Sequence, residues 1–235
     1  MKKKITIPVI LFASCISFVS CNNNDTNNAE MQPPTETKIV ESNEKPVNSD
    51  EAKSKTIENM QAAFKGETNA TATYAAFSKK AKEEGYNEIA LLFKAASMSE
   101  NIHAQNHKIV LEELGATVNE ITPDFTVKST KENLEYAISG EAYEVAEMYP
   151  SFLKTANAAN NQLAMVSLNY AYKTEIKHKA FYEKALTELN NNNVKSLPTV
   201  YFICPTCGNT YENTSSKRCG ISMTNGEKFI KINSL

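Results

Sequence analysis

Glu175-Ile176-Lys177-His178 and its near-twin Glu100-Asn101-Ile102-His103 decide how this sequence folds. Residues three apart share one face of a helix, so a carboxylate and an imidazole at this spacing can bind the same metal ion. The earlier motif interrupts an apolar stripe with steps of three or four residues: Ile89, Phe93, Ala96, Glu100, His103, His107, Val110, Leu114. Burying an unpaired carboxylate costs several kcal/mol, and a bound metal removes that penalty. The duplicated motif therefore predicts a metal centre inside a helical core.

Composition sets the frame for that prediction. A chain of 235 residues has room for one domain and a smaller second one. The hydrophobic fraction is 41% and there are only 7 glycines and 8 prolines, which is typical of a mostly helical globular protein. The net charge is −2 and basic residues cluster only at the extreme N-terminus, which argues against nucleic acid as a partner.

The N-terminal segment predicts export and lipidation. Three lysines precede an apolar run over residues 5–19 that is short for a membrane span. Phe18-Val19-Ser20-Cys21 then resembles the lipobox of bacterial lipoproteins, in which the cysteine becomes the lipid-modified N-terminus. An ordinary secretory signal cut elsewhere, or lipidation at Cys15, are the alternatives. We expect residues 1–21 to be a lipoprotein-type signal peptide and the protein to be lipid-anchored in a bacterial cell envelope, facing the periplasm or the surface.

Residues 22–53 are rich in Asn, Glu, Pro and Thr and contain no aromatic residue. Such a segment cannot bury enough apolar area to fold, so it predicts a disordered tether. The tether would join the anchor to a helical domain over residues 54–193.

Helical periodicity appears in four segments, which we expect over residues 54–84, 87–114, 129–158 and 160–189. Gly85 and Gly115 suit the ends of the first two, and Ser129 with Glu132 forms a capping box at the start of the third. Pro150 predicts a kink. A short connection, a long crossover and another short connection are typical of ferritin-like bundles.

The two halves of this bundle repeat each other. Glu67 recurs as Glu141 after 74 residues, and Tyr74 recurs as Tyr149 after 75. The two Glu-x-x-His motifs are also 75 residues apart, which predicts a pseudo-twofold arrangement. A dinuclear carboxylate bundle needs one Glu from each of two helices and a Glu-x-x-His from each of the other two. Glutamate with histidine suits iron or manganese better than calcium.

Residues 55–235 resemble the rubrerythrins, which join a ferritin-like di-iron bundle to a rubredoxin-like domain. The resemblance rests on Gly66-Glu67 with Tyr74, Glu100-x-x-His103, Gly140-Glu141-x-x-Glu144-x-x-x-x-Tyr149-Pro150, and Glu175-x-x-His178. It implies an all-α four-helix bundle followed by a small β-rich domain over residues 198–235. It also implies two irons bound by Glu67, Glu100, His103, Glu141, Glu144, Glu175 and His178, which reduce hydrogen peroxide to water.

The resemblance further implies that Glu144 and His103 alternate as ligands of one iron, and that the chain forms a homodimer. Tyr74 and Tyr149 lie near the same face and could donate hydrogen bonds to a bound peroxide; core packing with a satisfied hydroxyl is the alternative for both. His107 follows His103 by one turn, and we interpret it as a residue behind the ligands or an ordinary core residue.

The C-terminal segment departs from the family pattern. Cys204-Pro-Thr-Cys207-Gly208 is typical of a metal knuckle, and Cys219-Gly-Ile-Ser222 stands where a rubredoxin carries its second Cys-x-x-Cys. Serine is a weak ligand because its hydroxyl loses a proton far less readily than a thiol. We expect one iron or zinc at Cys204, Cys207, Cys219 and Ser222, with a Cys204–Cys207 disulfide or an empty knuckle as the alternatives.

The leading hypothesis is therefore a peroxide-reducing oxidoreductase with electrons relayed by the C-terminal metal from a donor that the sequence does not identify. An iron-oxidising or iron-binding protein and a metal-stabilised binding module without turnover are the alternatives. Peroxide consumption separates the first from the others, and ferrous oxidation separates the second from the third.

Overall fold

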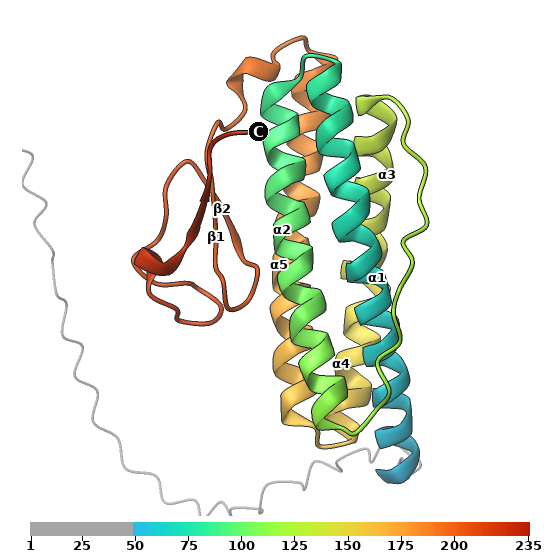
Figure 1. The fold of residues 1–235 in the computed structure, drawn as a ribbon. Helices are drawn as coiled ribbons and strands as arrows, with labels where there is room; N and C mark the ends of the chain where they lie inside the picture. The colour runs from blue at the N-terminus through green and yellow to red at the C-terminus, as the bar shows by residue number, and fades with distance from the viewer. Residues whose placement is uncertain (1–48) are drawn as a thin grey trace, which may run out of the picture. The chain divides into compact units, whose positions relative to one another are not determined.

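The structure is a computed structural model that describes residues 49–235, which belong to one compact unit. The expected signal peptide, Cys21 and nearly all of the expected tether lie outside the described residues. Within them the chain forms an elongated helical bundle with a small sheet beside it, which confirms the predicted fold class (Figure 1).

The bundle consists of α1 (Ser49–Glu83), α2 (Asn87–Glu113), α3 (Thr130–Tyr143) continued by η1 (Glu144–Met148) and α4 (Tyr149–Ala158), and α5 (Gln162–Asn190). α1 packs along α2, while α3 and α4 pack against α5. Contacts of α2 with α5 and of α1 with α4 close the bundle. With α3, η1 and α4 counted as one continuous helical segment, four segments surround one interior.

α1 begins at Ser49, earlier than the predicted start at residue 54. Asp50 and Glu51 lie in the first turn, where negative side chains interact favourably with the positive end of the helix dipole. Lys53 Nζ also lies 3.1 Å from Asp50 Oδ1. No glycine or proline separates residues 49 and 54, so the helix extends into the segment that we expected to be tether.

Glycines end the first two helices as predicted. Gly85 has φ +86°, and the next amide, that of Tyr86, donates to the Ala81 carbonyl at 2.8 Å. Gly115 has φ +67°, with Ala116 N–H bonded to the Leu111 carbonyl at 2.9 Å. These bonds satisfy terminal carbonyls and turn the chain back, which makes α1 and α2 antiparallel.

The long crossover between α2 and α3 runs the length of the bundle on the side of α1 (Figure 1). The Asp124 amide donates to Asn69 Oδ1 on α1 at 2.8 Å, which fixes the crossover against that helix. It ends in the predicted capping box: Ser129 Oγ accepts from the Glu132 amide, and the Glu132 carboxylate accepts from the Ser129 amide.

The predicted kink at Pro150 is a π-helical segment, η1, on the N-terminal side of the proline. The Tyr149 amide bonds to the carbonyl of Glu144, five residues earlier. Proline lacks an amide proton and its ring would clash with the carbonyl four residues before it, so the wider turn accommodates it.

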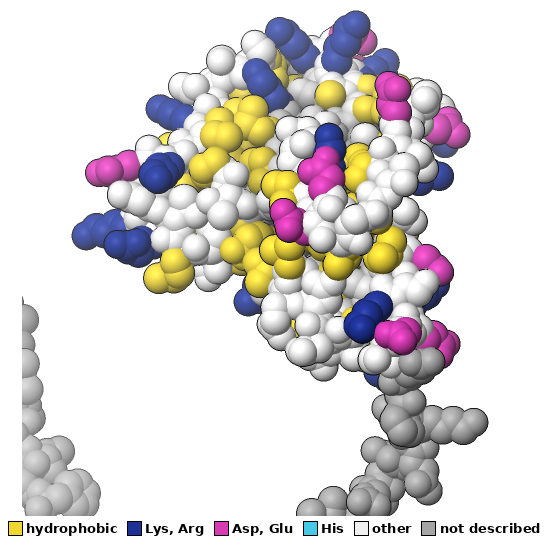
Figure 2. Space-filling view, turned by 60° about the horizontal axis from the view of Figure 1, so that its bottom comes forward, with side chains coloured by type: hydrophobic (Ala, Val, Ile, Leu, Met, Phe, Trp, Pro, Cys, Tyr) yellow, Lys and Arg dark blue, Asp and Glu magenta, His cyan; other side chains and the backbone are white. Residues whose placement is uncertain are grey.

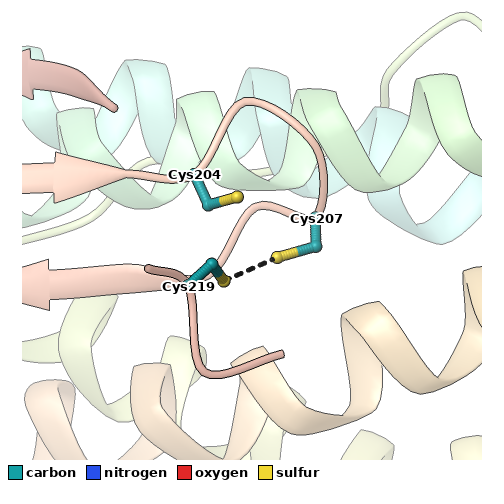
Figure 3. Close-up of side chains that lie close together, drawn as sticks. All are labelled: Cys204, Cys207 and Cys219. Carbon is teal, nitrogen blue, oxygen red and sulfur yellow. Dashed lines mark hydrogen bonds between the residues drawn. The ribbon is translucent and has the colours of Figure 1, made fainter. Parts of the chain in front are cut away.

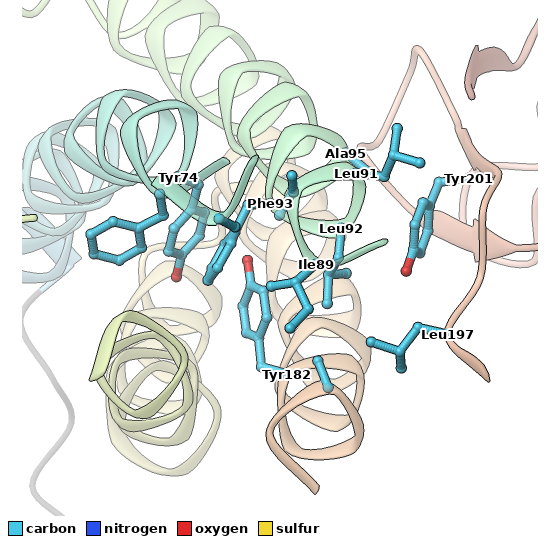
Figure 4. Close-up of a cluster of buried hydrophobic side chains, with 14 of the residues drawn as sticks. Tyr74, Ile89, Leu91, Leu92, Phe93, Ala95, Tyr182, Leu197 and Tyr201 are labelled. Carbon is cyan, nitrogen blue, oxygen red and sulfur yellow. The ribbon is translucent and has the colours of Figure 1, made fainter. Parts of the chain in front are cut away.

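After the short helix η2 (Val194–Ser196), the small domain forms a sheet of β1 (Tyr201–Ile203), β2 (Thr210–Glu212) and β3 (Ile230–Ile232) with order β2-β1-β3 and antiparallel pairing. The short helix η3 (Gly226–Lys228) precedes β3. Tyr201 and Leu197 belong to the same buried apolar cluster as Leu91 and Leu92 of α2, as Figure 4 shows. The small domain therefore packs on the bundle through a shared core.

Candidate metal centre

The two Glu-x-x-His motifs meet in the bundle interior and share their carboxylates. His103 Nδ1 lies 2.9 Å from Glu100 Oε2 and 2.9 Å from Glu175 Oε1. His178 Nδ1 lies 2.9 Å from Glu100 Oε1 and 2.8 Å from Glu175 Oε2. Each glutamate thus offers one oxygen to each imidazole, which is the geometry of a bridging carboxylate between two metal positions.

Glu67 on α1 and Glu141 on α3 complete the two positions. One group contains Glu67, Glu100, His103 and Glu175, and the other contains Glu100, Glu141, Glu175 and His178, with the ligand atoms of each group within 4.8 Å of one another. All six side chains are buried. No histidine is visible on the face drawn in Figure 2, in keeping with the burial of all three histidines of the chain.

The two tyrosines cross between the halves of the repeat. Tyr74 on α1 donates to Glu141 Oε1 on α3 at 2.8 Å, while Tyr149 on α4 donates to Glu67 Oε1 on α1. Burial, and then the charge of the partner glutamate, raises the pKa of both hydroxyls well above the usual value, so both keep their protons. Each outer carboxylate is therefore oriented by a tyrosine from the other half.

Glu144 is the predicted ligand that the structure does not bring into either group. It is half-buried at the start of η1, and its charge helps to raise the pKa of Glu67 and of Glu141. It lies near the centre on a segment of unusual helical geometry, and its alternation with His103 stays a prediction.

The hydrogen bonding of the candidate ligand atoms shows whether metal ions would fit this site. Several buried atoms have no hydrogen-bond partner among the described residues: both oxygens of Glu100 and Glu175, Oε2 of Glu141, and Nδ1 of His103 and His178. The Nδ1 atoms of His103 and His178 lie 2.8–2.9 Å from the oxygens of Glu100 and Glu175, but none of these contacts has the geometry of a hydrogen bond. Unsatisfied buried oxygens and nitrogens of this kind are rare and costly. Two cations with carboxylate and imidazole preference satisfy them all.

The charges of the buried glutamates and histidines also favour bound cations. Burial, followed by repulsion from Glu100 and Glu175, raises the pKa of Glu67 well above the usual value. Burial opposes ionisation of Glu100 as well, but the nearby imidazoles outweigh it and lower its pKa to about 2. For His178, burial lowers the pKa, and the carboxylates outweigh burial and raise it to about 9. Without metal, protons must occupy the positions that cations would fill.

The positions behind the tyrosines were not resolved by the sequence analysis. His107 and Tyr182 each follow a histidine of the motif by four residues, so they are equivalents in the 75-residue repeat. His107 Nε2 lies 3.4 Å from the Tyr149 hydroxyl and Nδ1 lies 2.8 Å from Ser167 Oγ. The Tyr182 ring instead packs on Tyr74, with centroids 5.5 Å apart (Figure 4). Extending the repeat by one turn would have found this pair.

The metal-binding arrangement agrees with comparisons to known proteins. The family model described as Rubrerythrin matches residues 58–186. The chain belongs to the rubrerythrin family. It is 32% identical to Rubrerythrin-2 of Clostridium acetobutylicum over 74% of this chain and 95% of the relative. It is 33% identical to nigerythrin of Nitratidesulfovibrio vulgaris over 71% of this chain and 81% of that protein.

Solved structures agree with the fold. The fully reduced, all-ferrous state of nigerythrin superposes with a TM-score of 0.67 at 30% identity, covering 75% of this chain and 86% of nigerythrin. A bacterioferritin of Desulfovibrio desulfuricans gives a TM-score of 0.58 at 22% identity, with 63% and 88% of the two chains covered, which shows the shared bundle fold.

The small domain of this rubrerythrin touches the ligand histidines directly. His103 Nε2 lies 3.1 Å from the Cys207 carbonyl, which can only accept, so Nε2 carries the proton and Nδ1 presents its lone pair to the metal position. Thr210 donates to the Gly208 carbonyl at 3.2 Å and its oxygen therefore accepts from His178 Nε2 at 3.1 Å. The segment from Cys207 to Thr210 therefore fixes the tautomers of both His103 and His178.

The knuckle brings three sulfurs together. Cys204, Cys207 and Cys219 are buried free thiols with ligand atoms within 4.8 Å of one another, so the disulfide considered for Cys204 and Cys207 is not formed (Figure 3). Cys207 Sγ lies 3.4 Å from Cys219 Sγ, and Ser222 Oγ lies 3.2 Å from Cys204 Sγ. Hydrogen bonds, first from Cys207 and then from Ser222, lower the pKa of Cys204 to about 4. The donor set suits a metal but is not the four-sulfur set of a rubredoxin.

Proposed function

We propose that this rubrerythrin reduces hydrogen peroxide to water at a dinuclear iron centre in its bundle. The observation that carries the proposal is the sharing of Glu100 and Glu175 between His103 and His178, with an outer carboxylate on each side. Two bound ferrous ions would supply the two electrons that cleavage of the peroxide O–O bond requires. The family membership of the chain supports the same activity.

The chain's own residues would position the substrate and its protons. Reduction of one peroxide to two waters consumes two electrons and two protons. Tyr74 and Tyr149 stay protonated, and each donates its one hydroxyl proton to an outer carboxylate. Either hydroxyl could turn this hydrogen bond from the carboxylate to a peroxide that enters the site. Phe77 and Phe93 pack around Tyr74 and exclude water from that end of the site.

Electron supply is proposed to come through the small domain. The Cys207 carbonyl and His103 Nε2 are joined by one hydrogen bond, so a metal held by Cys207 would lie a few bonds from a ligand of the bundle centre. In the structure this contact is made within one chain.

A second candidate is ferrous oxidation with retention of the iron. Ser222 in place of a fourth thiolate favours it, because a site that relays electrons poorly leaves oxidised iron in the bundle. The same bundle ligands serve both reactions, so the rate of electron return decides between them.

Steady-state peroxide consumption by the iron-loaded chain with an added reductant tests the proposal. We expect continued turnover with two electrons consumed per peroxide. The matched control is the zinc-loaded chain, which retains the fold but has no redox chemistry. Consumption that stops after one equivalent, with ferric iron retained, would favour the second candidate instead.

We also propose that Cys21 anchors the protein to a membrane in the cell envelope. Support comes from the short apolar segment that ends in Val19-Ser20-Cys21. Among the described residues, none of the helices has the length and apolar character needed to cross a membrane. Cys21→Ser should release the protein from the membrane fraction and abolish palmitate labelling without changing the purified domain. A soluble, unlabelled wild type would leave plain secretion as the explanation.

The homodimer implied by the family remains a proposal of the same kind. Sedimentation of the purified chain from residue 49 onward at several concentrations would distinguish one copy from two.

A further inference from the structure

The fourth corner of the knuckle is occupied by a hydroxyl that already has other partners. Ser222 Oγ lies 3.2 Å from Cys204 Sγ, one of the three sulfurs of the knuckle. Ser222 therefore lies beside the group of three sulfurs, at the sequence position where a rubredoxin carries its last cysteine. On the other side, Ser222 Oγ lies 2.9 Å from Thr224 Oγ1.

A chain of hydroxyl groups continues from this corner to solvent. Thr224 donates to Thr206 Oγ1 at 2.8 Å, so its oxygen is free to accept the proton of Ser222. The three cysteines are buried, whereas Ser222 and Thr224 are half-buried and Thr206 is exposed. The side of the knuckle that lacks a thiolate is thus the side open to water.

Ser222 is poorly suited to close the site. A neutral alcohol binds a soft metal weakly, and it becomes an anionic ligand only by losing a proton with a far higher pKa than that of a thiol. The serine Cβ–Oγ bond is also shorter than the cysteine Cβ–Sγ bond, so its oxygen reaches less far from the same backbone. A metal held by three thiolates keeps most of its coordination energy and one position that exchanges.

We propose that the small domain is an open three-cysteine metal site whose fourth position binds a low-molecular-mass thiolate from solution. A thiolate is the ligand that matches the other three donors in softness and charge. It would displace the Ser222 hydroxyl, which keeps its hydrogen bond to Thr224. Neither the site nor its ligand depends on peroxide reduction in the bundle.

The full chain loaded with Co²⁺ tests the proposal by absorption spectroscopy. Sulfur-to-cobalt charge transfer in the near ultraviolet arises only from thiolate ligands, so cobalt in the carboxylate centre does not contribute. Titration with 2-mercaptoethanol should raise this band by about a third, since a fourth Co–S bond joins three. A phosphine reductant, which supplies no thiolate, should leave the band unchanged.

Two variants make the result specific. Ser222→Cys closes the corner with a protein thiolate, so its band should start at the four-sulfur intensity and not respond to added thiol. Ser222→Ala removes the hydroxyl and should respond at least as strongly as the wild type.

Three results would overturn the proposal. The first is a wild-type band that does not change at saturating thiol, which would mean that Ser222 closes the site. The second is the same response in Ser222→Cys as in the wild type. The third is loss of the band on adding thiol, or its absence in wild type when Ser222→Cys shows it, because the three cysteines would then not retain a metal.

Discussion

The bundle centre and the small-domain centre are both candidate metal sites, but their donor groups are arranged in opposite ways. In the bundle the donors come from four long helical rods, lie inside the core and occur as a duplicated set. In the small domain the donors come from short loops, and one of the four corners is a half-buried hydroxyl. A rigid, dry interior favours a complete ligand set, because every unpaired carboxylate there is costly. A loop open to water tolerates an incomplete one.

The segment from Cys207 to Thr210 joins the two centres. Its carbonyl and hydroxyl oxygens accept from both ligand histidines, and Ser99 on α2 donates to the Gly208 carbonyl at 2.7 Å. Some substitutions should therefore change one centre alone, and substitutions in this segment should break the contact between the two centres.

The largest effect is expected from Glu100→Ala. This variant removes a carboxylate shared by both metal positions and leaves each of the two imidazoles with only one of its two central carboxylates, that of Glu175. The bundle should lose its metal, and peroxide turnover should fall by about a hundredfold or more, as removal of a main electrostatic group does elsewhere. Metal analysis and steady-state kinetics measure both, and the sulfur-to-cobalt band of the knuckle should stay.

Glu112→Ala on the exposed side of the same helix is the matched control and should retain both metals. A Glu100→Ala protein that still held two bundle metals and turned over normally would contradict the assignment of the centre.

Gly208→Ala should uncouple the two centres. An added Cβ would collide with the His103 imidazole and lie 2.8 Å from Ser99 Oγ, and Gly208 has φ +76°. The left-handed conformation alone costs about 1–2 kcal/mol for alanine, and the clash displaces the segment from His103. Electron transfer from a pre-reduced small domain should slow, while both centres keep their metals in stopped-flow and metal measurements.

Gly220→Ala in the same domain is the control, since its Cβ would meet only the Tyr211 hydroxyl, at 3.9 Å. An unchanged transfer rate in Gly208→Ala would mean that electrons enter the bundle by another route.

Tyr149→Phe and Tyr74→Phe should show whether the two tyrosines contribute equally to turnover at the bundle centre. Each removes one hydrogen bond to an outer carboxylate, worth about 1–2 kcal/mol, so turnover should fall by about tenfold with metal retained. Because His107 contacts the Tyr149 hydroxyl, which Tyr149→Phe removes, a further His107→Gln change should lower turnover in the Tyr74→Phe variant and have little additional effect in the Tyr149→Phe variant. Equal sensitivity in both backgrounds would show that His107 acts independently of Tyr149.

The smallest effect is expected for the pH dependence of the metal-free protein. Burial and neighbouring carboxylates raise the pKa of Glu67 and Glu141, while carboxylates that outweigh burial raise that of His178 to about 9. The folded state then binds more protons than the unfolded state from about pH 4.5 upward, so these groups stabilise it less as pH rises towards 9. The lowered pKa of Glu100 acts only below that range, whereas burial lowers the pKa of His107 to about 3, which opposes the trend up to about pH 6.5.

The midpoint of thermal unfolding in EDTA should accordingly fall between about pH 6.5 and pH 9, where the proton on His178 is lost. The metal-loaded protein should show a smaller fall or a rise, because metal binding replaces those protons. A midpoint that rises with pH without metal would contradict the description of the centre as a cluster of competing carboxylates.

Local sequence determined much of this protein. The spacing of Glu100 with His103 and of Glu175 with His178 places each pair on one helical face in any structure that keeps those helices. Gly85, Gly115 and the Ser129 capping box ended or began helices where predicted, because their effects act within one turn of the chain. The start of α1 was missed, since a polar, acidic segment can be either helix or tether, and its neighbours decide.

How the two halves of the bundle contact each other, and how the small domain contacts the bundle, depends on tertiary packing. The sharing of Glu100 and Glu175, the crossing of Tyr74 to Glu141, and the contact of Cys207 with His103 join residues that lie 67 to 104 positions apart. Helical periodicity fixes the direction of a side chain on its own helix, but not its distance to a side chain on another. That distance depends on how the helices pack around the shared core and, for Glu144, on the π turn that Pro150 imposes.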